Sequence, residues 1–158
     1  MRNIRTGTRT DTVSRESAMK KILFIDDEAL ILEIYSSKLQ QYGFRVDTAT
    51  DGLEALKMMR NSKPDVVVLD IMMPKFSGLE VLKYIRAEPA LKDLRVVVLS
   101  NMFVGAEERQ AATAGADKAL LKSSCTPALL VEAINEVMAA PRPDGQAPGP
   151  AGAPGGAA

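Results

Sequence analysis

The most informative absence in this 158-residue sequence is histidine, of which there is none. Without histidine the chain has no His-based zinc site, no serine–histidine or cysteine–histidine nucleophile and no phosphohistidine. A single cysteine, Cys125, excludes an internal disulfide framework and suits a reducing cytosol. Any chemistry must therefore use carboxylates, hydroxyl groups, lysine and a metal ion.

Two further absences narrow the class of protein. No apolar run approaches the roughly 20 residues that a membrane-spanning helix needs, and the start lacks the apolar core of a signal peptide. The 20 Lys and Arg residues are balanced by 20 Asp and Glu residues, so no basic field favours nucleic acid or an anionic membrane. We expect a cytoplasmic protein with no direct nucleic-acid or membrane partner.

The two ends of the chain differ in composition from its centre. Residues 1–18 are polar and aperiodic, and residues 141–158 are a low-complexity Pro/Gly/Ala tail, so we expect both to be disordered. Met19 stands directly before the first expected strand and is an alternative start site. Residues 19–140 then form a single domain.

Apolar β-favouring segments alternate with helical segments along this domain. The expected strands are residues 21–25, 44–48, 65–69, 95–99 and 117–121. The expected helices are residues 29–41, 51–61, 78–87, 104–114 and 127–140, with N-caps at Thr50 or Asp51, at Ser77 and at Thr126. Three strands are unbroken apolar runs, as in parallel strands covered on both faces. The pattern predicts an α/β fold with a doubly wound, parallel five-stranded sheet.

Chemically active side chains follow four of these strands. The first strand ends at Asp26 and Asp27, the third at Asp70, the fourth at Ser100 and the fifth at Lys122. Because ligands of doubly wound sheets bind beyond the carboxyl ends of the strands, we expect these groups to share one pocket. Neighbouring carboxylates repel each other, and a divalent cation together with the lysine would offset that repulsion. Ligands that are all oxygen favour Mg²⁺ over zinc.

Such a pocket suits phosphoryl chemistry. An aspartate beside Mg²⁺ can be a nucleophile toward phosphorus. The metal and Lys122 would stabilise charge on the transferring phosphoryl oxygens, and Ser100 could donate a hydrogen bond to one of them.

The sequence resembles the receiver domain of two-component response regulators over about residues 19–140. The motifs that carry the resemblance are FIDDE at 24–28, VVVLDIMMPKFSG at 66–78, VVVLSN at 96–101 and GADKALLK at 115–122. The spacings also agree, since Asp27, Asp70, Ser100 and Lys122 follow one another at intervals of 43, 30 and 22 residues. The resemblance implies the (βα)₅ flavodoxin-like fold.

The resemblance also implies a role for each residue of the pocket. Asp70 would be the phosphoacceptor. Asp27, Asp70 and the backbone carbonyl of Met72 would bind Mg²⁺ directly, and Asp26 would bind it through water. Ser100 and Lys122 would contact the phosphoryl group. The implied phosphoryl donor is a sensor histidine kinase or a phosphotransfer protein, and phosphorylation would alter binding to an output protein that the sequence does not identify. Such a domain is a phosphoacceptor that assists its own phosphorylation and dephosphorylation rather than an enzyme with a separate substrate.

Three positions depart from the family pattern. Ala119 stands where the family usually has a Tyr or Phe that moves on phosphorylation, so a switch must use other groups, for which Met102 and Phe103 are candidates. Ser123 replaces the proline that usually follows the lysine, which predicts a trans peptide bond and a differently placed loop. Asn101 replaces a small residue and could narrow access to the phosphoryl group.

Other functions stay open on the sequence alone. Asp26 and Asp27 could cap a helix, Lys122 could be a solvated lysine and Ser100 a loop residue. The chain could be a pseudo-receiver that binds a partner without phosphorylation. It could also be a Mg²⁺-dependent phosphatase, although Met72 stands where such enzymes place a second acid. Because the segment after residue 140 is short and polar, we expect a stand-alone receiver that signals by contact, or a phosphate shuttle or sink.

Overall fold

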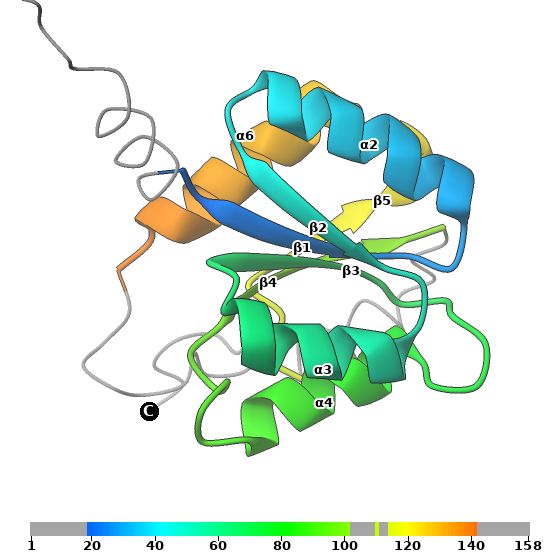
Figure 1. Ribbon diagram of the computed structural model, residues 1–158, viewed down its shortest axis with the longest axis vertical. Coiled ribbons are helices and arrows are strands. Elements are labelled where there is room, and N and C mark those ends of the chain that lie inside the picture. The colour runs from blue at the N-terminus through cyan, green and yellow to red at the C-terminus, as the bar shows by residue number, and fades with distance from the viewer. Residues whose placement is uncertain (1–18, 102–109, 111–113, 142–158) are drawn as a thin grey trace, which may run out of the picture.

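The computed structural model describes residues 19–101, 110 and 114–141 of the chain (Figure 1). Its strands are β1 (Lys21–Ile25), β2 (Arg45–Ala49), β3 (Val66–Asp70), β4 (Arg95–Ser100) and β5 (Lys118–Leu121). They form one five-stranded sheet in the order β2-β1-β3-β4-β5, and all four neighbouring pairs are parallel. The predicted doubly wound parallel sheet is confirmed.

The helices connect these strands in the predicted alternation. They are α2 (Ala29–Gln41), α3 (Gly52–Ser62), α4 (Gly78–Ala87) and α6 (Pro127–Ala139), with a short 3₁₀ helix, η1 (Lys122–Ser124), after β5. The ends of these strands and α-helices lie within one residue of their predicted positions, whereas η1 was not predicted. The helix expected over 104–114 and the terminal segments expected to be disordered fall almost wholly outside the described residues.

Helices cover the sheet on both faces (Figure 1). Alternate residues of β1 divide between two cores: Leu23 and Ile25 pack with α3 and α4, whereas Ile22 and Phe24 pack with α2 and α6. All five residues of β3 are buried, because this strand lies in the interior of the sheet. Burial on both faces accounts for the unbroken apolar runs in the sequence. Within the described part of the chain, no helix is both long and apolar enough to cross a membrane.

Side-chain caps fix where three of the helices begin. The Asp51 carboxylate, rather than Thr50, accepts the first-turn amide of α3. Ser77 and Glu80 form a reciprocal capping box at the start of α4, and Thr126 caps α6. Such caps satisfy amide groups that the helix itself leaves without acceptors, so they define the loops that connect strand ends to helices.

Candidate functional site

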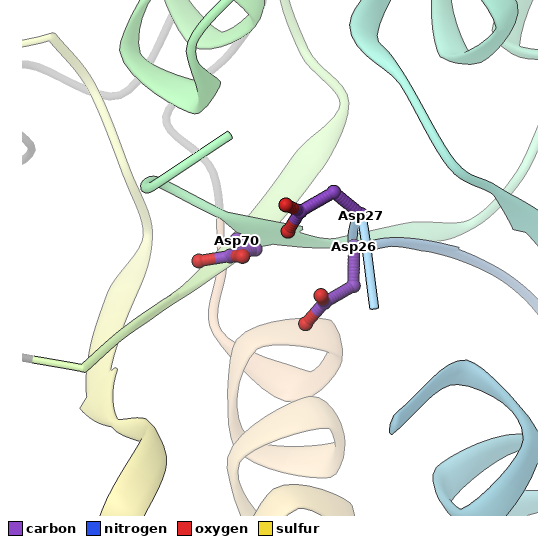
Figure 2. Close-up of side chains that lie close together, drawn as sticks. All are labelled: Asp26, Asp27 and Asp70. Carbon is purple, nitrogen blue, oxygen red and sulfur yellow. The ribbon is translucent and has the colours of Figure 1, made fainter. Parts of the chain in front are cut away.

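Three aspartates lie together at the carboxyl ends of β1 and β3 (Figure 2). The register of the two parallel strands explains why these aspartates are close. Ile25 pairs with Leu69, so the residues that follow them, Asp26 and Asp70, lie side by side at the carboxyl edge of the sheet. One carboxylate oxygen from each of Asp26, Asp27 and Asp70 lies within 4.8 Å of the others. Asp26 and Asp70 are buried, at 0% and 2% exposure, and Asp27 is exposed.

Lys122 reaches the same cluster from the end of β5, the edge strand two positions beyond β3 in the sheet. Its Nζ lies 2.6 Å from Oδ2 of Asp26, 3.4 Å from Oε1 of Glu28 and 3.5 Å from Oδ2 of Asp70. The side chain is 6% exposed, so it is not a solvated lysine. The alternative that Lys122 stays in solvent is therefore wrong.

Ser100 is the last residue of β4 and is fully buried. Asp70 pairs with Leu99 across β3 and β4, which places Ser100 one position beyond that pair at the same edge of the sheet. The structure therefore gathers the three aspartates, brings Lys122 into contact with Asp26 and Asp70, and puts Ser100 at the neighbouring strand end. The parallel topology thus places the ends of β1, β3 and β4 at one edge of the sheet.

Burial and mutual repulsion disturb the ionisation of Asp70. Burial raises the pKa of its carboxyl group from 3.8 to about 6, and the charge of Asp26 adds to that rise. The ammonium of Lys122 and the backbone N–H of Met72, which donates to Oδ1 at 3.1 Å, oppose the rise. With a pKa near 6, Asp70 is mainly a carboxylate at neutral pH, which is the state that a nucleophile needs.

Asp26 and Lys122 are coupled in the same way. Burial raises the pKa of Asp26, although Lys122 and the backbone N–H of Glu28 favour its charged form. Burial alone would lower the pKa of Lys122, but the carboxylates of Asp26 and Asp70 outweigh it and raise that pKa. The raised pKa of Lys122 favours its charged ammonium form at neutral pH, and that ammonium opposes the effect of burial on Asp26.

The cluster has the properties of a divalent-cation site. Its donors are carboxylate oxygens, the hard ligands that Mg²⁺ prefers. The contact of Lys122 with Asp26 is a charge contact, and Oδ2 of Asp26 is buried without a hydrogen bond of normal geometry. The three aspartates and Glu28 also outnumber the one ammonium group among them. A bound cation would supply the missing positive charge, so these residues fit Mg²⁺.

The backbone around Asp70 is tightly packed. A Cβ atom at Gly78 would lie 2.2 Å from the carbonyl oxygen of Asp70 and 2.6 Å from the Cα of Ile71, distances that real Cβ atoms do not adopt. The Gly78 N–H also donates to the carbonyl of Ile71 at 3.0 Å. Only glycine therefore lets α4 begin directly against the end of β3.

The structure describes all three residues that depart from the family pattern, Ala119, Ser123 and Asn101. Ala119 is half-buried in β5, and no aromatic ring stands there. No peptide bond between described residues is cis, so the Lys122–Ser123 bond is trans as predicted, and η1 carries the lysine into the cluster. Asn101 is exposed. The two switch candidates, Met102 and Phe103, lie outside the described residues.

Two residues near the cluster were missed by reasoning from the sequence. Glu28 was quoted within FIDDE but given no role, yet its carboxylate contacts Lys122. Gly78 ends the motif around Asp70, and its role depends on a close approach that no sequence pattern displays. The position of Glu28 directly after Asp26 and Asp27 in the sequence could have indicated that it belongs to the site. No feature of the sequence could have indicated the close contact of Gly78.

Residues 22–135 match the family model described as "Response regulator receiver domain". The chain belongs to this family. A receiver domain is a phosphoacceptor rather than an enzyme in the usual sense, and its acidic triad is the one that Asp26, Asp27 and Asp70 form here.

Named relatives agree with this assignment. The alkaline phosphatase synthesis transcriptional regulatory protein PhoP of Bacillus subtilis is 48% identical over 69 residues, which cover 44% of this chain and 29% of that protein. Response regulator MprA of Mycobacterium leprae is 36% identical over 124 residues, which cover 78% of this chain and 53% of that protein. The matches thus span about half or less of these longer relatives, and this receiver domain corresponds to only part of them.

Solved structures resemble the receiver domain over nearly their whole length. Chemotaxis protein CheY4 of Vibrio cholerae superposes with a TM-score of 0.71 at 30% identity, over 75% of this chain and 98% of that one. Response regulator protein TrrA of Thermotoga maritima, solved in complex with Mg²⁺-BeF, has a TM-score of 0.67 and 37% identity, over 75% and 99% of the two chains. The flavodoxin-like arrangement is therefore shared with single receiver domains.

Proposed function

We propose that this receiver domain accepts a phosphoryl group on Asp70 from a sensor histidine kinase or a phosphotransfer protein, and that phosphorylation alters its binding to a partner protein. The observation that carries the proposal is the contact of Lys122 with both buried aspartates, 2.6 Å from Asp26 and 3.5 Å from Asp70. A buried cluster of carboxylates with one lysine is costly to fold, and phosphoryl transfer is a function that needs it.

Asp70 is the proposed nucleophile. A carboxylate oxygen forms the bond to phosphorus while the bond from phosphorus to the donor's nitrogen breaks, and the donor's histidine leaves without the phosphoryl group. The Met72 N–H fixes one oxygen of Asp70, and the other faces Lys122. Water can later attack the acyl phosphate and regenerate the Asp70 carboxylate. This chain contains no histidine, so the proposed donor histidine lies outside it.

Three aspartates are the proposed holders of Mg²⁺. Asp27 and Asp70 would bind the ion directly, Asp26 through water, and the backbone carbonyl of Met72 would add a ligand. When bound, the ion neutralises charge on the phosphoryl oxygens. Asp26 has a second task in this arrangement, since its charge contact with Lys122 holds the ammonium at the end of β5.

Lys122 and Ser100 are the proposed phosphoryl contacts from the chain itself. The Lys122 ammonium is held between carboxylates at the site where negative charge accumulates during transfer, so it would stabilise that charge without reorganising. Ser100 ends the strand next to Asp70 and would donate its hydroxyl hydrogen to a phosphoryl oxygen. We place the protein in the cytoplasm, where sensor kinases present their phosphohistidine.

The test is intact mass after incubation of the protein with Mg²⁺ and acetyl phosphate, a small phosphoryl donor. We expect the wild type to gain one phosphoryl group and Asp70→Asn to gain none. Asp93→Asn removes an exposed carboxylate elsewhere and should gain the group as the wild type does.

The pseudo-receiver is the main competing function, since Ala119 removes the usual switch aromatic. A wild type that gains nothing from acetyl phosphate and nothing from a panel of phosphorylated kinases would refute the proposal and favour that alternative. Phosphate that survives in Asp70→Asn would place the acceptor at another residue.

A further inference from the structure

The loop that carries Lys122 into the site has little support of its own. The 3₁₀ helix η1 has three residues. Within this turn the Cys125 N–H donates to the Lys122 carbonyl at 3.3 Å, and the Ser124 hydroxyl donates to the Leu121 carbonyl at 3.4 Å. The strand before it, β5, has four residues, lies at the edge of the sheet and is half-exposed. A buried lysine on so short a turn needs support from another element.

Tyr35, in the middle of α2, supplies such support. Its hydroxyl donates to the backbone carbonyl of Cys125, 90 residues away and three positions after Lys122. Its ring stacks on Phe24, with centroids 5.6 Å apart and an interplanar angle of 24°. Phe24 lies on β1 two positions before Asp26, so one side chain joins the strand that carries Asp26 to the loop that carries Lys122.

We propose that Tyr35 is a positioning residue, whose hydroxyl holds the η1 loop so that the Lys122 ammonium stays against Asp26 and Asp70. Ser123 lacks the ring that fixes the backbone φ of proline, so the residue after the lysine does not stiffen this turn. The consequence for phosphoryl transfer rests on the function proposed above. The consequence for the placement of Lys122 does not.

Because the hydrogen bond between Tyr35 and Cys125 is buried, its loss would be costly. Tyr35 and Cys125 are each 8% exposed, so a carbonyl that lost the hydroxyl would have to move toward water to regain a partner. Burial also raises the pKa of Tyr35, which keeps its hydroxyl protonated and able to donate at neutral pH. Moving Cys125 moves η1, and with it the residue that contacts both aspartates.

The simpler explanation is that Tyr35 only fills the core between α2, β1 and α6. Tyr35→Phe separates the two roles, because it removes the hydroxyl and keeps the ring that stacks on Phe24. Tyr84→Phe is the matched control: it removes the hydroxyl of a half-buried tyrosine on α4, which contacts Arg60 on the opposite face of the sheet.

The first experiment measures the placement of Lys122 without metal or phosphate. The proteins are treated with formaldehyde and a mild reductant, and methylation of each lysine is followed by peptide mass. We expect Lys122 to react about tenfold faster in Tyr35→Phe than in the wild type, while exposed Lys38 and neighbouring Lys118 keep their rates. Tyr84→Phe should leave all three rates unchanged.

Two results of that experiment would overturn the proposal. In one, Lys122 reacts at the wild-type rate in Tyr35→Phe, so the hydroxyl does not hold the loop. In the other, the partly buried and ion-paired Lys118 accelerates as much as Lys122, so the variant has only loosened the whole fold.

The second experiment measures phosphorylation rates with acetyl phosphate and Mg²⁺ in a double-mutant cycle. If Tyr35 acts through the lysine, Tyr35→Phe slows phosphorylation about tenfold when Lys122 is present and less than twofold in a Lys122→Ala background. The same slowing in both backgrounds would refute that route. A wild type that no donor phosphorylates would refute the proposed function instead. The methylation rates would still show whether the Tyr35 hydroxyl keeps Lys122 in place.

Discussion

Replacing Asp70 by asparagine should stabilise the metal-free protein. The pKa of Asp70 rises from 3.8 to about 6 on folding, mainly because the carboxyl group is buried and secondarily because it lies beside Asp26. A rise of that size means that the charged carboxylate costs the folded state about 3 kcal/mol at pH 7.5. Asparagine has the same shape and no charge, so we expect Asp70→Asn to gain between about 1 and 3 kcal/mol.

The sign of the pH dependence follows from the same shift. A carboxyl group whose pKa is raised in the folded state binds its proton more tightly there than in the unfolded chain. The destabilisation is therefore full above about pH 6, declines as the pH falls through that value and vanishes below about pH 4. The stability difference between Asp70→Asn and the wild type should shrink in that window, and other carboxyl groups cancel because both proteins contain them.

Urea unfolding in EDTA, at pH 7.5 and at pH 4.5, measures the effect. Asp93→Asn, on an exposed aspartate, is the control and should change the free energy of unfolding by less than about 0.5 kcal/mol. Adding Mg²⁺ at a hundred times its dissociation constant should stabilise the wild type by about 2.7 kcal/mol and Asp70→Asn by much less. An Asp70→Asn protein that is no more stable than the wild type in EDTA would refute the reasoning, because the carboxylate would then have no folding cost for a cation to relieve.

Two further substitutions test the packing that places the site. Gly78→Ala should lower the free energy of unfolding by about 1 to 3 kcal/mol in urea titrations, because its Cβ would overlap the Asp70 carbonyl; an unchanged midpoint would mean that α4 can move away freely. Arg86→Ala should cost about 3 to 5 kcal/mol, because Arg86 bonds the carbonyls of Gly115 and Lys92 and pairs at 3.0 Å with the largely buried Asp117. Adding Asp117→Asn should recover part of that loss, and a double variant as unstable as the single one would contradict the charge argument.

The strand ends were predictable because their signals are local. Val66 to Leu69 form a short, unbroken, β-branched apolar run, which favours a strand covered on both faces, and a polar residue directly after such a run marks its carboxyl end. The parallel topology then places Asp70 beside Asp26 without any knowledge of side-chain contacts. The errors in the predicted ends of strands and helices were single-residue shifts, because hydrogen bonding rather than composition decides where an element ends.

The supports of the site were not predictable in the same way. Tyr35 and Cys125 are 90 residues apart, and Lys122 and Glu28 are 94 residues apart, so no local period reports either contact. In the sequence Tyr35 is one more residue of the apolar face of α2, beside Leu32 and Leu39. A hydroxyl on such a face is a signal only after the fold shows which backbone carbonyl it meets.

The arrangement of charges explains why a domain would keep so unfavourable a cluster. Asp26 and Asp70 each have a raised pKa although Lys122 lies against both, so one ammonium does not neutralise the site. Hydrophobic residues of similar volume would fold at least as well there. The cluster is therefore a cost to stability that makes sense if a cation and a phosphoryl group complete it. The same logic explains why Lys122 needs holding: a mobile ammonium could leave for water and abandon both carboxylates.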